Sequence, residues 1–389
     1  MIQRIAIPLI LTIVLSDLYI DMHYFRRPYH IKRWQRILWW TPCAVMIVYT
    51  CLLASIHNFA PSDLTWLNLY LLLIGLFVGP KAIFTICSSV GWVLRKTIIP
   101  THRNYGHYIG LIAGVLAVAA YLYGLTIGVG KIRVRHVDVY FADLPKSFDG
   151  YKILHVSDLH LGTFDGWRRT IPENEMDSIK AQKVNLICFT GDLQNMRPQE
   201  VLAMQNTIRP AMVGAISVLG NHDYAEYVKH TPQIESQMMK QLLTYERKNL
   251  GWAVLNNEHI TIHNGNDSIV IVGTENDGRP PFPQRADWAK AFRGVSKNAF
   301  VICLQHDPSA WERTILPKTN AQLTLSGHTH GGQMQILGHR PTQLSQLEDY
   351  GLYERNGRYI YVTSGLGGLV PFRLNMPNEI AIITLHRQQ

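Results

Sequence analysis

The chain has 389 residues, and its formal net charge of +9 hides two unlike parts. Residues 1–130 are strongly apolar and hold 10 Lys and Arg against 3 Asp and Glu, whereas residues 131–389 hold 27 against 25. A nucleic-acid partner would require a basic face on the soluble part, so this balance argues against one. The five cysteines include no CxxC pair, which argues against a disulfide scaffold and a cysteine zinc site. We predict that Cys188 and Cys303, inside apolar runs, are buried strand residues.

Residues 1–130 contain four apolar stretches that are long enough, or nearly so, to cross a bilayer, which takes about 20 helical residues. They run near 5–24, 37–57, 64–94 and 107–129. The first could also be a signal peptide, but no small-x-small cleavage site follows it and three further stretches do. The sequence therefore predicts a transmembrane module of about four helices at residues 1–130.

Polar residues and glycines add detail to this module. Pro80 and Lys81 predict that the third span ends near Gly79 and that an interfacial helix follows, with cations that reach for lipid head groups. Asp17 and Asp21, one turn apart, are expected near the membrane interface. Glycines in steps of four with one gap suit close helix packing in the fourth stretch. These glycines are Gly110, Gly114, Gly124 and Gly128.

The loops between the stretches predict the orientation. The second loop, His57 to Asp63, has no Lys or Arg, whereas the first and third are basic. Their cations are Arg26, Arg27, Lys32, Arg33 and Arg36 in the first loop and Arg95, Lys96 and Arg103 in the third. The positive-inside rule places both basic loops in the cytoplasm and residues 131–389 outside it. Three cations directly after the last span, Lys131, Arg133 and Arg135, favour the opposite orientation.

From Lys131 onward the hydropathy pattern changes to that of a soluble domain. Residues 132–141 alternate apolar and polar, which is typical of a strand. Residues 170–183 and 231–249 are predicted helices. The order of strand, polar loop, helix and strand indicates α/β layers. Further predicted strands lie in YKILHVSDLH, VNLICFTGD, AISVLGNHD, SIVIVGT, NAFVICLQHD, AQLTLSGHTH, YIYVTSG and NEIAIITLH.

Polar residues gather just after the carboxyl ends of five predicted strands, where α/β sheets place ligands. They are Asp158 and His160 in SDLH, Asp192 in TGD, Asn221, His222 and Asp223 in GNHD, His306 in LQHD, and His328 and His330 in GHTH. A single histidine of this kind is more often a hydrogen-bonded loop residue, but five clusters in one chain argue for a shared role. Carboxylate oxygens, an amide oxygen and imidazole nitrogens suit divalent cations such as Mn, Fe or Zn.

The motif order DxH, GD, GNHD, H and GHTH resembles that of the calcineurin-like metallophosphoesterase superfamily, over about residues 150–385. GHTHGGQ and GLGGLVPFRLNMPNEIAIITL are further similar to a bacterial branch of membrane-attached or exported enzymes that includes the YkuE-like proteins. The resemblance implies an α/β fold in which a two-sheet β-sandwich is flanked by helices. We expect this catalytic domain at residues 131–389, after the all-α transmembrane module.

The resemblance also implies roles for the clustered residues. One metal would be held by Asp158, His160, Asp192 and His330, and the other by Asp192, Asn221, His306 and His328. Asp192 would bridge the two metals, and His222 would stabilise the phosphate or protonate the leaving oxygen. Asp223 would either orient His222 or cap a turn. Asn195 stands where relatives often have Asp, which could soften metal affinity or ligand orientation.

These roles predict a membrane-anchored phosphoesterase that uses two divalent metal ions. Two divalent cations carry more positive charge than the two ligand carboxylates neutralise, and the excess would attract a phosphate. A hydroxide that bridges the metals would attack phosphorus. The bond would be a phosphoester or a pyrophosphate. The alternative is a non-catalytic metal-binding or sensor domain on a membrane module. A transporter is disfavoured because the spans lack an obvious polar path.

Four spans are more than an anchor requires, which suggests a lipid-linked substrate. The candidates are a phospholipid head group, a polyprenyl pyrophosphate and a UDP-linked lipid precursor, the last of which would require a cytoplasmic active site. Apolar residues in GLVPFRL and RPPFP could form a lip near the membrane or belong to the core. The predicted location is a bacterial plasma membrane, with the catalytic domain outside the cytoplasm.

Overall fold

The computed structural model describes the whole chain except residues 1, 27–30, 59, 62, 99–102, 165 and 389. Its contacts divide the chain into two compact units. The first unit comprises Met1–Gly124 with Tyr227–Lys229, and the second Leu125–Glu226 with His230–Gln389. The first strand of the second unit begins at Ile132.

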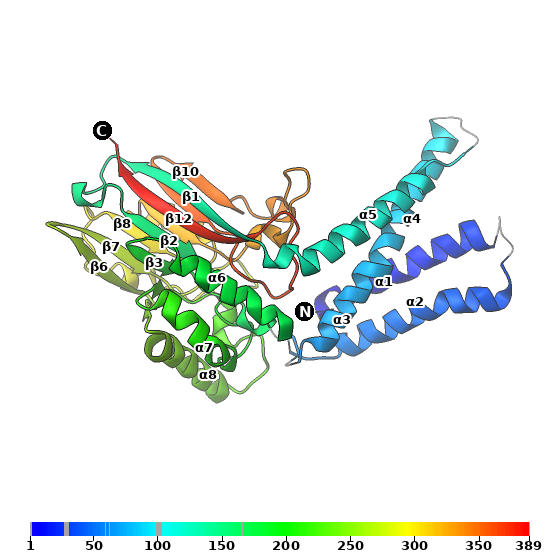
Figure 1. Cartoon of the computed structure of the whole chain (residues 1–389), viewed down its shortest axis with the longest axis horizontal. Helices are drawn as coiled ribbons and strands as arrows, with labels where there is room; N and C mark the ends of the chain where they lie inside the picture. Colours follow the sequence, from blue (N-terminus) through cyan, green and yellow to red (C-terminus); the bar gives the residue numbers. More distant parts are fainter. Residues whose placement is uncertain are drawn as a thin grey trace. The chain divides into compact units, whose positions relative to one another are not determined.

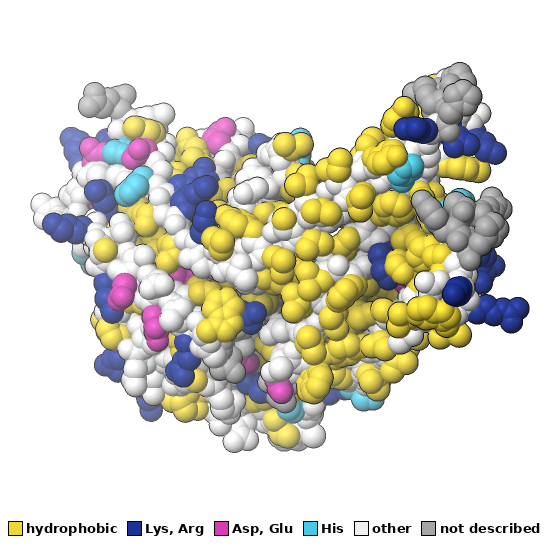
Figure 2. Space-filling view, turned by 45° about the vertical axis from the view of Figure 1, so that its right-hand side comes forward, with side chains coloured by type: hydrophobic (Ala, Val, Ile, Leu, Met, Phe, Trp, Pro, Cys, Tyr) yellow, Lys and Arg dark blue, Asp and Glu magenta, His cyan; other side chains and the backbone are white. Residues whose placement is uncertain are grey.

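The first unit is a bundle of helices (Figure 1). Four of its helical segments are long and apolar enough to cross a membrane, as the sequence predicts. They are α1 (Ile2–Ile20) with a π-helical extension (Asp21–Phe25); α2 (Arg33–Ala54); α3 (Thr65–Leu73) joined through a π-helical segment (Ile74–Val78) to α4 (Gly79–Thr97); and α5 (Gly106–Thr126). Figure 2 shows hydrophobic side chains along this unit and Lys and Arg side chains gathered at one end.

The third span differs from the prediction, because the helix does not stop at Gly79. Thr65–Thr97 is continuous, and the π-helical segment lies immediately before Pro80. Proline has no backbone N–H to donate. A π-helical turn shifts the backbone hydrogen-bond pattern, so the helix can continue through the proline. The Lys81 ammonium does not reach outward for head groups. It donates to Asp17 Oδ1 at 2.7 Å inside the bundle.

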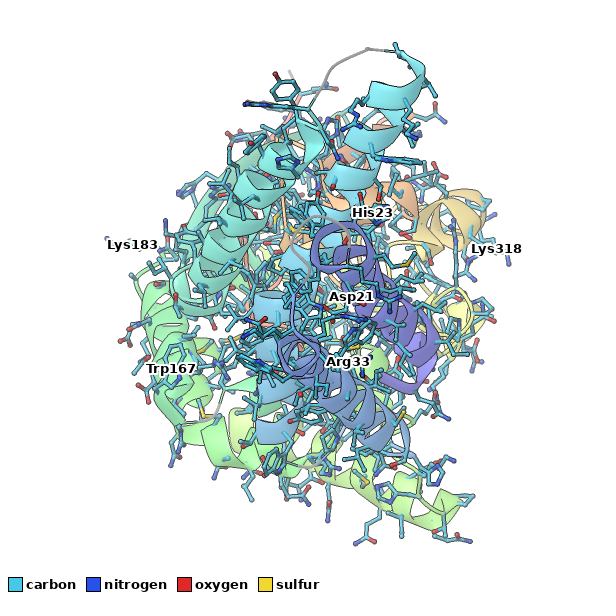
Figure 3. All side chains as sticks on the ribbon, turned by 90° about the vertical axis from the view of Figure 1, so that its right-hand side faces the viewer. Asp21, His23, Arg33, Trp167, Lys183 and Lys318 are labelled. Carbon is cyan, nitrogen blue, oxygen red and sulfur yellow. The ribbon has the colours of Figure 1, made fainter. Side chains whose placement is uncertain are left out.

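Both acidic residues of α1 and its extension are buried within the bundle. Asp17 is 2% exposed and pairs with Lys81. Asp21, labelled in Figure 3, is fully buried and accepts hydrogen bonds from Arg26 and, through two nitrogens, from Arg36. A buried carboxylate is stable only when it is paired and hydrogen-bonded, so these ion pairs are what permits the acids to lie there.

The glycine pattern of the fourth span packs as predicted. A Cβ atom at Gly110 would lie 3.0 Å from the Phe84 backbone, and one at Gly114 would lie 3.4 Å from the Pro80 carbonyl. The absent side chains therefore let α5 approach α4 closely. Gly124 is also buried, whereas Gly128 lies beyond the helix in a 3₁₀ turn.

The second unit contains two six-stranded sheets, which confirms the predicted two-sheet architecture (Figure 1). The first sheet has the order β1 (Ile132–Phe141), β12 (Asn378–Arg387), β2 (Lys152–Val156), β3 (Leu186–Phe189), β4 (Ile216–Ser217) and β5 (Ala253–Val254). The second has the order β10 (Gly351–Arg355), β11 (Arg358–Val362), β9 (Leu323–Ser326), β8 (Val301–Leu304), β7 (Asp267–Gly273) and β6 (Glu258–Asn264).

The two sheets pack face to face through one apolar core. Ile153 and Cys188 of the first sheet share this core with Ile302 and Leu323 of the second. The central strands β2, β3, β8 and β9 are almost wholly buried, which explains their continuous apolar sequences. Cys188 and Cys303 are fully buried in β3 and β8, as predicted.

Helices cover the outer faces of this sandwich. A second core joins β2 and β3 to α6 (Thr170–Lys180), α7 (Gln199–Met212) and α8 (Pro232–Thr244). A third core packs α9 (Trp288–Ala291) and a π-helical turn (Trp311–Ile315) against the second sheet. The sequence analysis did not identify α7, β5, β6 or β10. The strands among these are short or lie at sheet edges, and α7 has many polar residues.

A buried arginine fixes the segment that supports the site. Arg373 is 1% exposed, and its guanidinium donates to the backbone carbonyls of Ser364, Gly365 and Gly367 at 2.6–3.1 Å. The Gly367 amide in turn donates to the carbonyl of Asp158. Burial lowers the pKa of Arg373 to about 10, so the side chain stays charged at neutral pH.

We expect Arg373→Lys to destabilise the chain by about 2–3 kcal/mol, because an ammonium cannot serve the same set of buried carbonyls as a planar guanidinium. The measurement is the thermal unfolding midpoint of the detergent-solubilised chain without added metal. Arg133→Lys, on an exposed position of β1, is the matched control and should leave the midpoint unchanged. Equal midpoints for the two variants would contradict this role of Arg373.

Candidate metal centre

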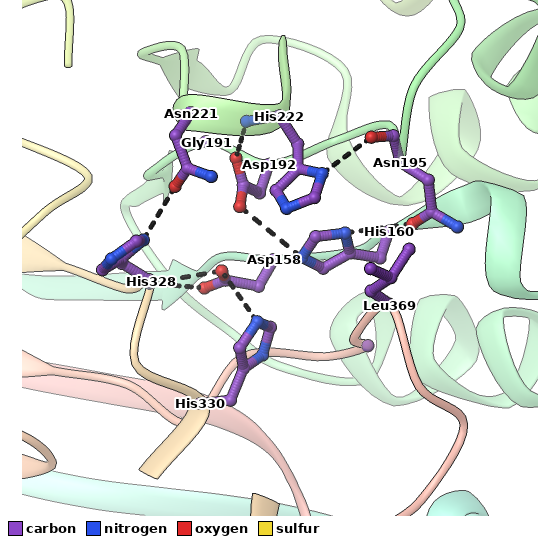
Figure 4. Close-up of polar contacts among 12 residues, drawn as sticks. Asp158, His160, Gly191, Asp192, Asn195, Asn221, His222, His328, His330 and Leu369 are labelled. Atoms are coloured by element: carbon purple, nitrogen blue, oxygen red, sulfur yellow. Dashed lines mark hydrogen bonds and ion pairs between the residues drawn. The ribbon is translucent and has the colours of Figure 1, made fainter. Parts of the chain in front are cut away.

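The five motif loops converge at one edge of the sandwich. Parallel strands β2, β3 and β4 end at this edge in the first sheet, and β8 and β9 end there in the second. Every site residue predicted from the sequence lies in these loops, and Figure 4 shows most of them around one centre. They are Asp158, His160, Asp192, Asn221, His222, His306, His328 and His330.

The side chains form overlapping groups whose donor atoms lie within 4.8 Å of one another. One group contains Asp158, His160 and His330, and another contains Asp192, His306 and His328. A third combines His160, Asp192 and His222. Asp192 is therefore central, because its Oδ2 lies 3.5 Å from His160 Nε2 and 3.2 Å from His306 Nε2.

Asn221 contacts two members of the second of these groups. Its Oδ1 lies 3.1 Å from His306 Nε2 and 2.7 Å from His328 Nδ1. A single amide oxygen is thus held between two imidazole nitrogens. His328 also lies 3.5 Å from the carboxylate of Asp307, which the sequence analysis did not select although it directly follows His306.

Burial keeps three of the imidazoles neutral. It lowers the pKa of His160 to about 3, lowers that of His330 well below its ordinary value, and lowers that of His328. Neutral imidazole is the form that binds a metal. Within the described chain, His160 Nε2 and His330 Nδ1 are buried and have no hydrogen-bond partner. Such orphaned nitrogens fit a cation-binding role, because buried polar atoms are otherwise almost always paired.

The two carboxylates differ in acidity. Burial raises the pKa of Asp158 to about 6. Burial also acts to raise the pKa of Asp192, but His306 and His222 beside it hold that pKa well below the ordinary value. In His306 the attraction of Asp192 outweighs burial and raises the pKa to about 10. A divalent cation would compete with the His306 proton for the same carboxylate oxygen.

The backbone at the site is strained. Five of its residues adopt the left-handed conformation, which costs non-glycine residues roughly 1–2 kcal/mol each. They are Asp158 (φ 55°), His160 (φ 47°), Asp192 (φ 58°), His328 (φ 71°) and His330 (φ 52°). Strain of this kind clusters at functional sites, where the surrounding structure enforces it.

Two glycines permit the loops to approach the carboxylates. A Cβ atom at Gly220 would lie 2.3 Å from Asp192 Oδ1, and one at Gly327 would lie 2.2 Å from Asp158 Oδ2. Any side chain at either position would collide with a carboxylate. The glycines of GNHD and GHTH are therefore required for these loops to pack closely against Asp192 and Asp158.

Asp223 caps a turn, which is one of the two roles expected for it. Its carboxylate accepts hydrogen bonds from the backbone amides of Asp192, Leu193, Gln194 and Gly220. It thereby fixes the turn that carries Asp192. His222 Nδ1 instead lies 2.7 Å from the backbone carbonyl of Asn195.

Asn195 contacts two of the site histidines. Its side-chain amide lies 3.0 Å from His160 Nδ1, while its backbone carbonyl meets His222. Glu200, which the sequence pattern did not reveal, holds this loop, because its carboxylate accepts hydrogen bonds from the backbone amides of residues 195–197. The available signal was an acidic residue in the first turn of α7, but that position is common in helices and not specific to a site.

The two apolar segments suspected of forming a lip differ. In GLVPFRL, Arg373 is buried and bound to backbone carbonyls, whereas Leu369, Val370, Phe372 and Leu374 are only partly buried. In RPPFP, the ring of Phe282 packs edge-on against His328 with centroids 4.6 Å apart. Phe282 therefore borders the site.

Known families match both units. The model described as "Calcineurin-like phosphoesterase" matches residues 151–332, and "Probable Calcineurin-like phosphoesterase, transmembrane domain" matches residues 3–129. An uncharacterized metallophosphoesterase of Aquifex aeolicus is 31% identical over 264 residues, which cover 65% of this chain and 92% of that protein. The uncharacterized metallophosphoesterase YkuE of Bacillus subtilis is 29% identical over 294 residues, covering 70% and 94%.

A further relative has a named activity. The UDP-2,3-diacylglucosamine pyrophosphatase LpxG of Chlamydia muridarum is 26% identical over 295 residues, which cover 62% of this chain and 86% of that protein. The resemblance seen in the motifs is thus confirmed across the catalytic unit, and the membrane module has its own family match. The chain belongs to the calcineurin-like metallophosphoesterase family and is a membrane protein with the family's four-helix transmembrane domain.

Proposed function

We propose that this protein is a membrane-anchored phosphoesterase that uses two divalent cations to hydrolyse a phosphoester or pyrophosphate bond of a lipid-linked substrate. The observation that carries the proposal is the pair of buried donor groups on either side of Asp192. A structural zinc site would need only one closed set of ligands. Two adjoining sets suit a two-metal phosphoesterase.

The donor set supports the ligand assignment that the motif resemblance implies. Asp158, His160, Asp192 and His330 would hold one cation, and Asp192, Asn221, His306 and His328 would hold the other. Nitrogen and oxygen donors without thiolate suit Mn, Fe or Zn. When bound, the cations would supply Lewis-acid activation of water and positive charge for the phosphate.

Asn195 would set the tautomer of a ligand. A cation at His160 Nε2 requires the proton of the neutral ring to lie on Nδ1. With the Asn195 amide turned so that its oxygen faces the ring, His160 Nδ1, which lies 3.0 Å from this amide group, would then donate to that oxygen. An amide oxygen can serve this function as the more usual carboxylate does, with a weaker hydrogen bond.

His222 is suited to hold a proton beside the reacting phosphate. Its Nδ1 would donate to the Asn195 carbonyl at 2.7 Å, and this contact turns the opposite ring edge toward His160 and Asp192 (Figure 4). The protonated ring would donate to the leaving oxygen. A metal sensor without turnover would have no need for a histidine oriented in this way.

An exposed aliphatic loop beside the site supports a lipid-linked substrate. Leu337 is 95% exposed and Leu344 is 94% exposed, and Ile336 and Leu347 are more than half exposed. Isolated exposed leucines are ordinary, but four exposed large aliphatic residues within 12 positions of one loop are typical of lipid or protein contact. The name of the LpxG relative, a diacylglucosamine pyrophosphatase, points to the same substrate class.

This loop is tied to the histidine turn. Thr329, between His328 and His330, donates to the backbone carbonyl of Asp349, and the Asp349 carboxylate binds Arg340 and Thr342. A lipid chain held by the loop would therefore lie at a fixed position relative to His328 and His330. The site and the aliphatic loop form one structural element.

Sidedness remains a prediction of the positive-inside rule, which places residues 131–389 outside the cytoplasm. Of the cations counted for it, Arg27 lies outside the described residues. A reporter enzyme fused to the C-terminus, active only outside the cytoplasm, tests the placement. Activity of a cytoplasm-specific reporter instead would move the substrate list toward UDP-linked precursors.

With Mn²⁺, the purified chain should hydrolyse bis-p-nitrophenyl phosphate or its monoester. Asp192→Asn should abolish this activity, because the carboxylate between the two groups is lost. His222→Ala should keep both metals, measured by elemental analysis, and lower kcat about 10²–10⁴-fold, as expected for a lost general acid.

The controls separate the competing outcomes. Asp177→Asn, at an exposed carboxylate of α6, should retain full activity and metal content. Metal loss in His222→Ala would overturn its assignment as a non-ligand. Bound metal without hydrolysis of either compound in the unaltered chain would favour the sensor function.

Leu337→Ser combined with Leu344→Ser should raise KM for a micellar long-chain lipid pyrophosphate about ten-fold, because part of the apolar contact is lost. The kcat on soluble bis-p-nitrophenyl phosphate should not change. Leu202→Ser, at an exposed leucine of α7, is the matched control. Equal KM values for the long-chain substrate in all three proteins would exclude the loop from substrate binding.

A further inference from the structure

An unassigned cavity of about 400 Å³ lies at one end of the helical bundle, where α4 ends and α5 begins. Its basic lining residues are His23, Arg95, Arg103 and His107, and its aromatic lining residues are Tyr19, Tyr24 and Trp92. No carboxylate lines it among the described residues. This composition is that of an anion site bordered by interfacial aromatic side chains.

A second cavity of about 310 Å³ adjoins the first and shares two of its residues, Arg95 and Arg103. Apart from these, its lining is almost wholly apolar and comes from α4 and the start of α5. Ile86, Val90, Leu94 and Ile109 are among its residues. The two guanidinium groups therefore stand at the boundary between a polar pocket and an apolar groove.

The polar pocket is built around a buried serine. Ser88 is 0% exposed, and its hydroxyl lies 3.0 Å from the Tyr19 hydroxyl and 2.6 Å from the Tyr24 hydroxyl. The Asn104 amide donates to the same hydroxyl and to the Ser88 carbonyl. The His23 ring stacks on Tyr19 with centroids 4.2 Å apart. These contacts fix the lining before any ligand arrives, which lowers the entropy lost on binding.

The start of α5 adds to the positive potential. The Asn104 side-chain oxygen accepts a hydrogen bond from the Gly106 amide at the first turn of α5. His107 lies in the same turn and lines the pocket. The remaining amides of the first turn give the end of this 21-residue helix a partial positive charge. The helix end and the two arginines therefore act on the same cavity.

We propose that these two cavities bind one anionic phospholipid, with its phosphate at Arg95 and Arg103 and an acyl chain in the groove between α4 and α5. A free phosphate would use the polar pocket but would gain nothing from the apolar groove. An amphiphile satisfies both cavities at once. Basic pockets between transmembrane helices that open to an apolar groove suit anionic lipid head groups.

This lipid is distinct from the proposed substrate. The pocket lies at the first turn of α5, and the 21 residues of that helix span about 30 Å, the thickness of a bilayer core, before the chain leaves it. The bound lipid would belong to the leaflet at the basic-loop end of the bundle. It would stabilise the packing of α4 and α5 and take no part in hydrolysis.

The test uses the full chain in nanodiscs or mild detergent, with native mass spectrometry to count retained lipids. Phosphatidylglycerol should be retained at least about ten-fold more than phosphatidylcholine. Arg95→Gln with Arg103→Gln should lose this retention by about ten-fold or more. Lys32→Gln with Arg33→Gln removes the same charge from exposed positions outside both cavities and should change retention less than two-fold.

A further variant tests the groove. Ile109 is 60% exposed and lines it, so Ile109→Trp fills the groove without disturbing the core. It should reduce phosphatidylglycerol retention and leave displacement by glycerol phosphate unchanged. Circular dichroism and the thermal midpoint establish that each variant is folded.

Three outcomes would overturn the proposal. If the double variant of Arg95 and Arg103 and the control double variant of Lys32 and Arg33 lost lipid retention equally, binding would be due to diffuse charge attraction. Full displacement of the lipid by inorganic phosphate, with no effect of Ile109→Trp, would show a free-phosphate site. Equal retention of the two lipids would show no anion selectivity. None of these measurements requires turnover, so their failure is distinct from failure of the proposed hydrolysis.

Discussion

The carboxylate of Asp192 is the group around which the second unit is organised. It lies between two candidate sets of metal-binding side chains, and three backbone hydrogen bonds to Asp223 hold the turn that presents it. The surrounding loops come from both sheets, so the sandwich must form before the two sets can meet. The left-handed backbone at five of these residues is a cost that the packed core offsets.

Around this carboxylate, single residues serve more than one neighbour. Asn195 contacts His160 through its side chain and His222 through its carbonyl, so one loop positions a proposed ligand and the proposed general acid. Asp349 likewise joins the histidine turn to the aliphatic loop through Thr329. Such shared supports keep a site with many ligands within the tolerance that catalysis requires.

In the membrane module, buried charged groups are paired with groups of opposite charge. Its two buried acids each have a basic partner, because an unpaired charge in an apolar bundle is too costly. Lys81 forms such an ion pair with Asp17, whereas Arg95 and Arg103 line cavities at the end of the bundle.

The sequence by itself determined the spans and the central strands, because continuous apolar runs are a local property. The two-sheet class followed from the resemblance of its motifs to a known family. It also identified the candidate site residues that the loops bring together, since each motif directly follows a buried strand. Edge strands such as β10 and the helix α7 carry too weak a hydropathy pattern to be found. Only the tertiary structure decided that Asp223 caps a turn, that Asp17 pairs with Lys81, and that Arg95 and Arg103 share two cavities. Each of these depends on which distant segments pack together, and packing is a property of the whole chain that no local pattern contains.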